Sequence, residues 1–362
     1  MKLLSLELKN FRNHRDAKAE LGGASTLLLG ENGSGKTNWV EAAVLLSLGR
    51  SFRGARDREL IAANADAFEV RGVVAGRGGV TREILARGSR EGAREVRVDG
   101  EPLARLTDLL GRFPTVHFSV EDVSVFGGGA AARRRFLDIA LCQLESAYVG
   151  ALRDYMAALK QRNRLLQESG RGPVDEDELG VWETILARSG LELDRRREAL
   201  TAELHRRMRE LAGLVDPGLV PTLEYVAPGE ETAEARGSRL AAMRSRDRRL
   251  GWTADGPHRA RLACRIAGRE LGEGASRGYS RLYSILLRLA VARVLAERLD
   301  EAPVVLLDDP ESELDARWIG PILGLIPESS QTVVTACRTL TAHPARFTEV
   351  AMESIAVARS AA

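Results

Sequence analysis

A glycine-rich octapeptide at residues 30–37 has the types and spacing of residues that bind phosphate. It follows the apolar residues 26–29 and reads Gly30, Glu31, Asn32, Gly33, Ser34, Gly35, Lys36, Thr37. In this pattern, G-x-x-x-x-G-K-[ST], glycines let backbone N–H groups close around a polyphosphate, and the following helix start adds partial positive charge. Lys36 can reach the β- and γ-phosphates, and the Thr37 hydroxyl can bind Mg²⁺. The order of strand, loop and helix argues against a chance glycine-rich turn.

Two carboxylates far along the chain could complete such a site. Asp308 and Asp309 follow the apolar residues 304–307, so they stand at the tip of a predicted buried strand. An acid there can hold the Mg²⁺ that Thr37 also binds, which gives Asp308 the metal role. Asp309 is then placed to orient an attacking water. A solvated pair of acids at a strand end is the simpler alternative.

Residues 306–315, Leu-Leu-Asp-Asp-Pro-Glu-Ser-Glu-Leu-Asp, resemble the Walker B and D-loop segment of ABC-type ATPases. The resemblance implies that Asp308 is the magnesium aspartate, that Asp309 stands at the position of the catalytic glutamate, and that Asp315 is the D-loop aspartate. Two motifs so far apart in one chain predict an ABC-type ATPase head.

Composition limits the class of protein. The chain has 362 residues, 44% of them hydrophobic, which is enough for one large or two ordinary domains. No run of about twenty apolar residues occurs, so no membrane span is expected. The N-terminus lacks the long apolar region of a signal peptide. Three widely spaced cysteines form neither a metal motif nor a disulfide framework, and a cytoplasmic protein is expected.

The net charge of +2 does not by itself indicate a nucleic-acid-binding protein. Clusters of arginine are the candidates for a surface that contacts the phosphate backbone. They lie at residues 133–135, 195–197, 206–207 and 244–249. For any single cluster, a solvated helix face with neighbouring acids is the simpler interpretation.

Hydrophobic periodicity divides the chain into three segments. Residues 1–115 are β-rich with one long helix and predict the N-terminal half of the head, lobe I. Residues 116–244 predict a compact helical lobe, lobe II. Residues 245–362 predict the C-terminal half of the head, with the signature, Walker B and D-loop. The predicted strands are 3–8, 26–29, 68–75, 80–86, 96–98, 304–309, 331–335 and 349–357, and the predicted helices are 37–46, 134–167, 179–214, 282–299 and 317–325. The fold class is therefore α/β, a split mixed sheet with a phosphate-binding loop plus a helical lobe.

Further short motifs resemble the RecF family of recombination mediators, which belongs with the SMC- and Rad50-like heads. They include residues 6–14 (Leu-Glu-Leu-Lys-Asn-Phe-Arg-Asn-His), 51–53, 133–138, 159–163 and 256–259 (Gly-Pro-His-Arg). These motifs span nearly the whole chain. The lack of a long coiled coil separates the chain from Rad50 and SMC proteins.

The resemblance implies an ABC-type head that binds ATP and Mg²⁺ and dimerises head to tail on ATP. It implies backbone-directed DNA binding without sequence readout, and action with RecR and RecO to help load RecA at single-strand gaps. The corresponding roles are DNA repair, DNA replication and the SOS response to DNA damage.

The resemblance also places residues around a nucleotide shared by two protomers. Ser276 and Gly278 match the signature motif and would contact the γ-phosphate held by the partner protomer. Tyr279 and Ser280 depart from that motif, and a plain helix N-cap at Ser280 is the alternative. Arg12 is implied to lie near the nucleotide by likeness to the Rad50 head, whereas an ordinary strand-end arginine is the alternative.

The residues at the positions that would act in ATP hydrolysis predict a weak ATPase. Asp309 is one methylene shorter than glutamate, and no switch histidine follows the strand predicted at 331–335. ATP would then time the opening of a clamp made of two protomers. Two other functions stay open, a soluble ATP-binding subunit of a transporter and a non-catalytic ATP-gated protein scaffold.

Overall fold

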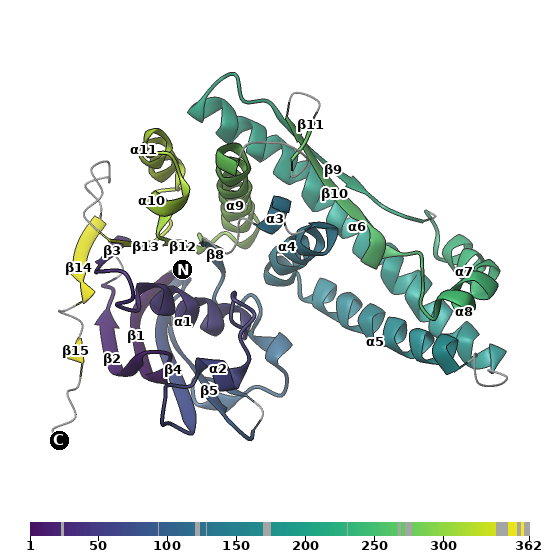
Figure 1. Ribbon diagram of the computed structural model, residues 1–362, viewed down its shortest axis with the longest axis horizontal. Helices are drawn as coiled ribbons and strands as arrows, with labels where there is room; N and C mark the ends of the chain where they lie inside the picture. Colours follow the sequence, from purple (N-terminus) through teal and green to yellow (C-terminus); the bar gives the residue numbers. More distant parts are fainter. Residues whose placement is uncertain are drawn as a thin grey trace. The chain divides into compact units, whose positions relative to one another are not determined.

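The chain forms two compact units in the computed structural model (Figure 1). Unit 1 comprises Met1–Val123, Glu210–Leu219 and Ser276–Ala362, and unit 2 comprises Ser124–Arg209 and Val220–Ala275. The structure describes residues 1–22, 25–92, 94–119, 124–127, 129–168, 175–229, 231–266, 269–271, 277–337, 347–352 and 356–357.

Unit 1 contains an antiparallel sheet with the strand order β15-β2-β1-β4-β5-β6-β7. Its strands are β1 (Lys2–Phe11), β2 (His14–Glu20), β4 (Ala67–Ala75), β5 (Thr81–Ser89), β6 (Glu95–Val98), β7 (Glu101–Pro102) and β15 (Ala356–Val357). Buried and part-exposed residues alternate along β4, as expected for a strand with one face on the core. The strands predicted at 3–8, 68–75, 80–86 and 96–98 are confirmed.

A parallel sheet with the order β14-β3-β13-β12-β8 forms the second layer of unit 1. Its strands are β3 (Ser25–Leu29), β8 (Thr115–Phe118), β12 (Val304–Asp308), β13 (Thr332–Ala336) and β14 (Phe347–Ala351). All residues of β12 and β13 are buried, which explains their continuous apolar and β-branched sequences. The single strand predicted at 349–357 is instead two, because β14 pairs with β3 while β15 pairs with β2 of the other sheet.

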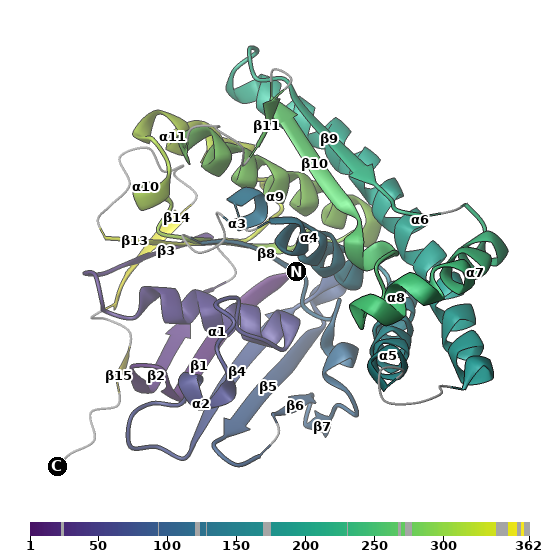
Figure 2. The same ribbon diagram turned by 45° about the vertical axis from the view of Figure 1, so that its right-hand side comes forward.

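Helix α1 (Lys36–Leu48) lies between the two sheets of unit 1 and contacts strands of both (Figure 2). Nearly all of its residues are buried, so its sequence is apolar around the whole circumference. The other helices of unit 1 are α2 (Asp57–Leu60), α9 (Arg277–Leu299), α10 (Pro310–Glu313) and α11 (Ala316–Leu325), with short 3₁₀ turns at Arg77–Gly79 and Leu106–Leu109. Packing between the two sheets therefore fixes the position of α1, the helix that follows the phosphate-binding loop.

Unit 2 combines helices with a small sheet of order β11-β10-β9. Its elements are α3 (Ser124–Gly127), α4 (Gly129–Leu144), α5 (Ser146–Glu168), α6 (Glu176–Val215, whose residues from Glu210 belong to unit 1), β9 (Pro221–Val226), α7 (Ala233–Ala242), α8 (Arg244–Leu250), the 3₁₀ turn η4 (Pro257–Arg259), β10 (Arg261–Ile266) and β11 (Arg269–Glu270). The helix predicted at 134–167 is two helices, α4 and α5, which meet at Glu145.

The predicted segment boundary at residue 245 does not coincide with the boundary between the units. Residues 245–275 belong to unit 2, because β10 pairs with β9 along its whole length. Unit 2 therefore contains a three-stranded sheet, of which only β9 lies within the lobe predicted at 116–244. Among the described helices, none is long and apolar enough to cross a membrane.

Candidate nucleotide-binding site

The glycine-rich loop joins β3 to α1, as the sequence predicts. Gly33 and Gly35 have φ values of 84° and 96°, a region that L-residues with side chains rarely adopt. At Gly35 a Cβ atom would also lie 2.5 Å from both Asn13 Oδ1 and His14 Nε2, so these side chains would have to shift to admit it. The backbone conformation requires glycine at this position, and the close packing of Asn13 and His14 favours it further.

Lys36 is 6% exposed, and the loop surrounds its ammonium group. The Nζ atom donates to the carbonyl oxygens of Gly30 and, at 2.7 Å, Glu31. A lysine held by the carbonyls of its own loop carries its charge within the glycine-rich loop. This arrangement suits a polyphosphate.

The predicted metal ligands Thr37 and Asp308 lie together, although 271 positions separate them. Thr37 Oγ1 donates to Asp308 Oδ1 at 2.9 Å, and Thr335 Oγ1 donates to the same oxygen at 2.7 Å. The three residues come from α1, β12 and β13, at the carboxyl edge of the parallel sheet, where ligands of open α/β sheets bind. Hydroxyl and carboxylate oxygens are donors that Mg²⁺ prefers, so the residues present fit that ion.

Asp308 is only 3% exposed, and this burial raises the pKa of its carboxyl group. The hydrogen bonds from Thr335 and Thr37 and the positive charge of Arg53 oppose the rise, and the neighbouring charge of Asp309 adds to it. A dication would be the natural counter-charge for a carboxylate held in this setting.

Asp309 adopts a left-handed conformation with φ 45°, at the N-cap of α10. Its backbone N–H donates to Thr335, to the carbonyl oxygen at 3.1 Å and to Oγ1 at 2.9 Å. Non-glycine residues held at positive φ cluster at functional sites, where the surrounding structure over-determines them. Thr335 thus fixes both aspartates. Its role was not predicted from the sequence, although it lies in a correctly predicted strand at the same sheet edge.

Arg12 lies in the turn between β1 and β2, beside α1. Its guanidinium makes a bidentate pair with Glu41, with Nε–Oε2 and Nη2–Oε1 distances of 2.8 and 2.7 Å, and Nη1 donates to the Glu59 carbonyl at 2.8 Å. Glu41 is fully buried on α1, and Ser51 Oγ donates to it as well. The Arg12 side chain, 21% exposed, thus ties the turn to the helix that follows the loop.

The remaining predicted positions lie at the surface of unit 1 or outside the described residues. Asp315 caps α11 by accepting from the Arg317 N–H at 3.2 Å. Gly278 is exposed at the start of α9, with open space where a side chain would project. Ser276 lies outside the described residues. One further contact of the loop was not expected: Cys337 Sγ lies 2.8 Å from Asn32 Oδ1.

Many arginines of the candidate DNA-binding clusters are paired within unit 2. Arg197 is buried and binds Asp138 and the Pro257 carbonyl, while Arg244 binds Glu176 and Glu183. Arg196 pairs with Glu145 and Glu192, and Arg133 lies 3.7 Å from Glu270. These arginines have acidic partners, as the simpler interpretation expects, but Arg133 and Arg197 are buried and therefore lie on no solvated face. Arg135, Arg246 and Arg249 are exposed.

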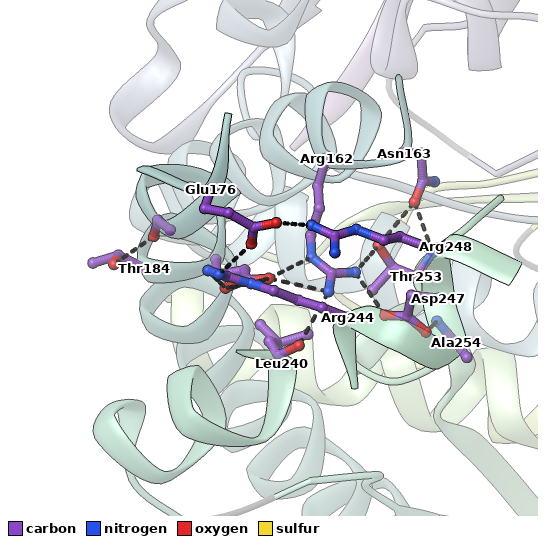
Figure 3. Close-up of polar contacts among 12 residues, drawn as sticks. Arg162, Asn163, Glu176, Thr184, Leu240, Arg244, Asp247, Arg248, Thr253 and Ala254 are labelled. Atoms are coloured by element: carbon purple, nitrogen blue, oxygen red, sulfur yellow. Dashed lines mark hydrogen bonds and ion pairs between the residues drawn. The ribbon is translucent and has the colours of Figure 1, made fainter. Parts of the chain in front are cut away.

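Arg162, from a motif noted in the sequence, is the centre of a buried polar cluster in unit 2 (Figure 3). It is fully buried and donates to Asp247 at 2.7 Å, Thr253 at 2.8 Å, Glu183 at 3.2 Å and the Leu240 carbonyl at 3.2 Å. Every polar atom of its guanidinium therefore has a partner on α6, α7, α8 or the segment that follows α8. The cluster is structural and leaves no guanidinium atom of Arg162 for a ligand.

Comparison with known proteins places this chain in a family. Residues 2–358 match the model described as the RecF/RecN/SMC N terminal domain. The DNA replication and repair protein RecF of Synechococcus sp. (strain JA-2-3B'a(2-13)) is 35% identical over 346 residues, which cover 92% of this chain and 91% of the relative. The protein of the same name from Chlorobium phaeovibrioides is 31% identical over 354 residues, which cover 95% of each chain.

Solved structures agree with this placement. The structure of the recombination mediator protein RecF-ATP in the RecFOR pathway matches with a TM-score of 0.90 and 29% identity, covering 98% of this chain and 97% of the other. An Smc head domain from Pyrococcus furiosus matches with a TM-score of 0.56 and 19% identity, covering 97% of this chain and 94% of the other, which supports the fold alone. With an ABC-type head, a loop that fits phosphate and relatives of this identity and coverage, the chain belongs to the RecF family.

Proposed function

We propose that this protein is an ATP-dependent DNA-binding clamp that mediates recombination in DNA repair and replication and in the SOS response. The observation that carries the proposal is the convergence of Thr37, Asp308 and Thr335 beside the glycine-rich loop, in a chain of the RecF family. The names of the relatives favour this function over a transporter subunit or a protein scaffold. The site of action would be the cytoplasm.

ATP would be bound by the glycine-rich loop, with its phosphates on the backbone amides of residues 30–37 and on Lys36. Thr37 and Asp308 would hold Mg²⁺, which would neutralise charge on the phosphates. Asp309 would orient the attacking water from its half-buried, left-handed position. Arg12 stays in the proposed site, because its side chain is 21% exposed and it lies next to Asn13, which packs against Gly35.

A second protomer would supply the rest of the nucleotide contacts. A Cβ atom placed on the exposed Gly278 would meet nothing within 4 Å in its own chain, so packing within the protomer does not require glycine there. Close backbone approach by a partner's phosphate would require it. Ser276 and Asp315 would act in the same interface. ATP would then favour the closed dimer by differential affinity, and hydrolysis would open it.

Hydrolysis would be slow, because Asp309 is one methylene shorter than a glutamate at the same position. The slow hydrolysis of bound ATP would therefore set how long the dimer stays closed. DNA would be held mainly through its phosphates, without sequence readout and with strong salt dependence. RecR and RecO, implied by the family resemblance, would be the protein partners.

Sedimentation of the purified protein with ATP, ADP or no nucleotide tests this proposal. We expect the mass to double only with ATP, and we expect Gly278→Arg to abolish the doubling while ATP binding persists. Gly213→Arg is the matched control, because Gly213 is also an exposed helical glycine with open space around it. A wild-type protein that binds no nucleotide, or that stays monomeric with ATP, would contradict the proposal.

A further inference from the structure

The turn between β1 and β2 touches the end of the phosphate-binding loop through two side chains. Asn13 Oδ1 accepts from Asn38 Nδ2 at 2.7 Å, and His14 Nε2 lies 3.2 Å from the Gly35 carbonyl oxygen. Gly35 packs so closely here that a Cβ atom would collide with both side chains. The turn therefore lies directly on the last loop residue before Lys36.

The bond from His14 has one possible direction. A carbonyl oxygen only accepts, so Nε2 carries a hydrogen and donates it to Gly35. Burial lowers the pKa of His14 and so favours the neutral imidazole, although the bond to Gly35 opposes this effect. The ring also stands edge-on to the Trp39 indole of α1, with 5.5 Å between the ring centroids. Both ring contacts hold His14 in one orientation.

The turn is itself held firmly to the rest of unit 1. Arg12 has φ 56° and Asn10 has φ 50°, so the chain reverses sharply around Phe11. The Arg12 N–H donates to the Leu60 carbonyl at 2.7 Å, and its guanidinium makes the bidentate pair with the buried Glu41. These bonds fix the position of the turn, and so they also fix the position from which His14 contacts the loop.

We propose that His14 is a positioning residue that prevents rotation of the Gly35–Lys36 peptide. In a trans peptide the carbonyl of one residue and the N–H of the next point in opposite directions. A hydrogen bond that directs the Gly35 carbonyl toward His14 therefore directs the Lys36 N–H to the other side. Glycine has no side chain to restrict this rotation, so a partner outside the loop must do so. The Gly35 carbonyl also accepts from the Asn38 N–H at 2.9 Å, which ties the same peptide to the first turn of α1.

This inference rests on the proposed function, since the Lys36 N–H is one of the amides that would face a bound phosphate. The proposed positioning role of His14 can be distinguished from a role in folding alone. A residue that only fills space beside Trp39 would change stability and leave the preference for polyphosphate unchanged. A residue that sets the Lys36 amide would change affinity for ATP and ADP more than affinity for AMP, which lacks the β- and γ-phosphates.

Two variants separate the functions of the ring and of its N–H group. His14→Phe keeps an aromatic ring against Trp39 and removes the donor, whereas His14→Gln keeps an amide donor and removes the ring. We expect His14→Phe to weaken binding of ATP and ADP by about 3- to 10-fold, the size of one hydrogen bond, with little change for AMP. We expect the dissociation constant of His14→Gln for ATP to lie within about twofold of the wild-type value, because this variant keeps one hydrogen-bond donor.

The experiment measures the dissociation constants of ATP, ADP and AMP by calorimetry on the full chain, together with Tm without nucleotide. The inference would be overturned if both variants lost ATP affinity equally and in proportion to their decrease in Tm. It would also be overturned if His14→Phe bound ATP with wild-type affinity. Failure of the proposed function would look different, because wild-type protein and Lys36→Ala would then bind ATP equally poorly.

Discussion

The candidate nucleotide site of unit 1 and the polar cluster of unit 2 use charged residues in opposite ways. In unit 1 a contiguous loop with two left-handed glycines surrounds one lysine, whose ammonium is held by backbone carbonyls. In unit 2 arginines distant in sequence pair with buried carboxylates, and Arg162 and Asp247 are fully buried. The comparison teaches that a buried charge alone does not mark a ligand site, because both regions contain one, and that the left-handed glycines around Lys36 distinguish the candidate site.

The two regions also differ in how they respond to the loss of one residue. A buried ion pair tolerates replacement of both partners but not of one, because the remaining charge is then buried without a partner. A phosphate-binding loop depends on backbone direction, so its sensitive residues include glycines that carry no charge. The following predictions test this contrast, from the largest expected effect to the smallest.

Replacing Arg162 should destabilise unit 2 by about 3–5 kcal/mol, because Asp247 would stay buried without its cation and Glu183 would keep Arg244 but lose Arg162. We expect Arg162→Met to show this loss in urea unfolding, with faster hydrogen exchange in α5 and α8. Arg164→Met is the matched control. Arg164 is on the same helix but exposed, and its pair with Glu178 at 3.5 Å should contribute less than about 1 kcal/mol. Equal losses in the two variants would refute the contrast between buried and exposed arginines.

Gly35→Ala should weaken ATP binding by roughly 10- to 100-fold, because the left-handed conformation costs about 1–2 kcal/mol and the new methyl group collides with Asn13 and His14. Gly33→Ala has the same backbone strain without the collision, so the difference between the two variants measures the contact with the turn. Calorimetric binding of ATP checks both. A larger loss for Gly33→Ala would show that the turn contributes little to the loop.

Metal-dependent ATP binding should weaken as pH falls, beginning at a higher pH than for an ordinary aspartate. Asp308 would bind a cation as the carboxylate, and burial raises the pKa of this group, so protonation sets in earlier on acidification. Thr335→Val removes a hydrogen bond that lowers the pKa, and should therefore move this loss to higher pH still. The measurement is ATP affinity with and without Mg²⁺ across the acidic range. An unchanged pH profile in Thr335→Val would contradict this role of the threonine.

Tyr155→Phe should destabilise unit 2 by about 1 kcal/mol, the smallest of these effects. His258 Nε2 lies 2.9 Å from the Thr253 carbonyl and donates to it, so His258 Nδ1 accepts from the Tyr155 hydroxyl. Removing the hydroxyl leaves this nitrogen without its donor. Urea unfolding measures the loss, and ATP affinity should stay unchanged. A change in ATP affinity would mean that the two regions are not independent in the way proposed.

The sequence predicted the features of unit 1 that follow from local pattern. The loop, the Asp308 strand and most strands of the antiparallel sheet follow from glycine spacing and hydrophobic periodicity, which are properties of neighbouring residues. Thr335 could have been inferred, because parallel strands bring their carboxyl ends to one edge. His14 was part of a recognised motif, but its contact with Gly35 depends on a sharp turn that periodicity does not show.

Unit 2 was harder to predict, for physical reasons. Strands β9 and β10 are short and separated by α7 and α8, so no hairpin pattern marks their pairing. The charged run 244–249 resembles a solvated helix face, yet Asp247 within it is fully buried. Its partner Arg162 lies 85 positions away, and pairing over that distance is decided by tertiary structure.

The strand order of the parallel sheet has a consequence for how the protein is made. Strands β3 and β8 leave the ribosome early, but β13 and β12 lie between them and are translated last of the four. The Gly30 N–H, at the end of β3, donates to the carbonyl of Ala336. A nascent chain therefore carries a complete phosphate-loop sequence for most of translation without the partner strands that hold it. Under the proposed function, nucleotide binding would wait until β12 and β13 have been made, near the end of translation.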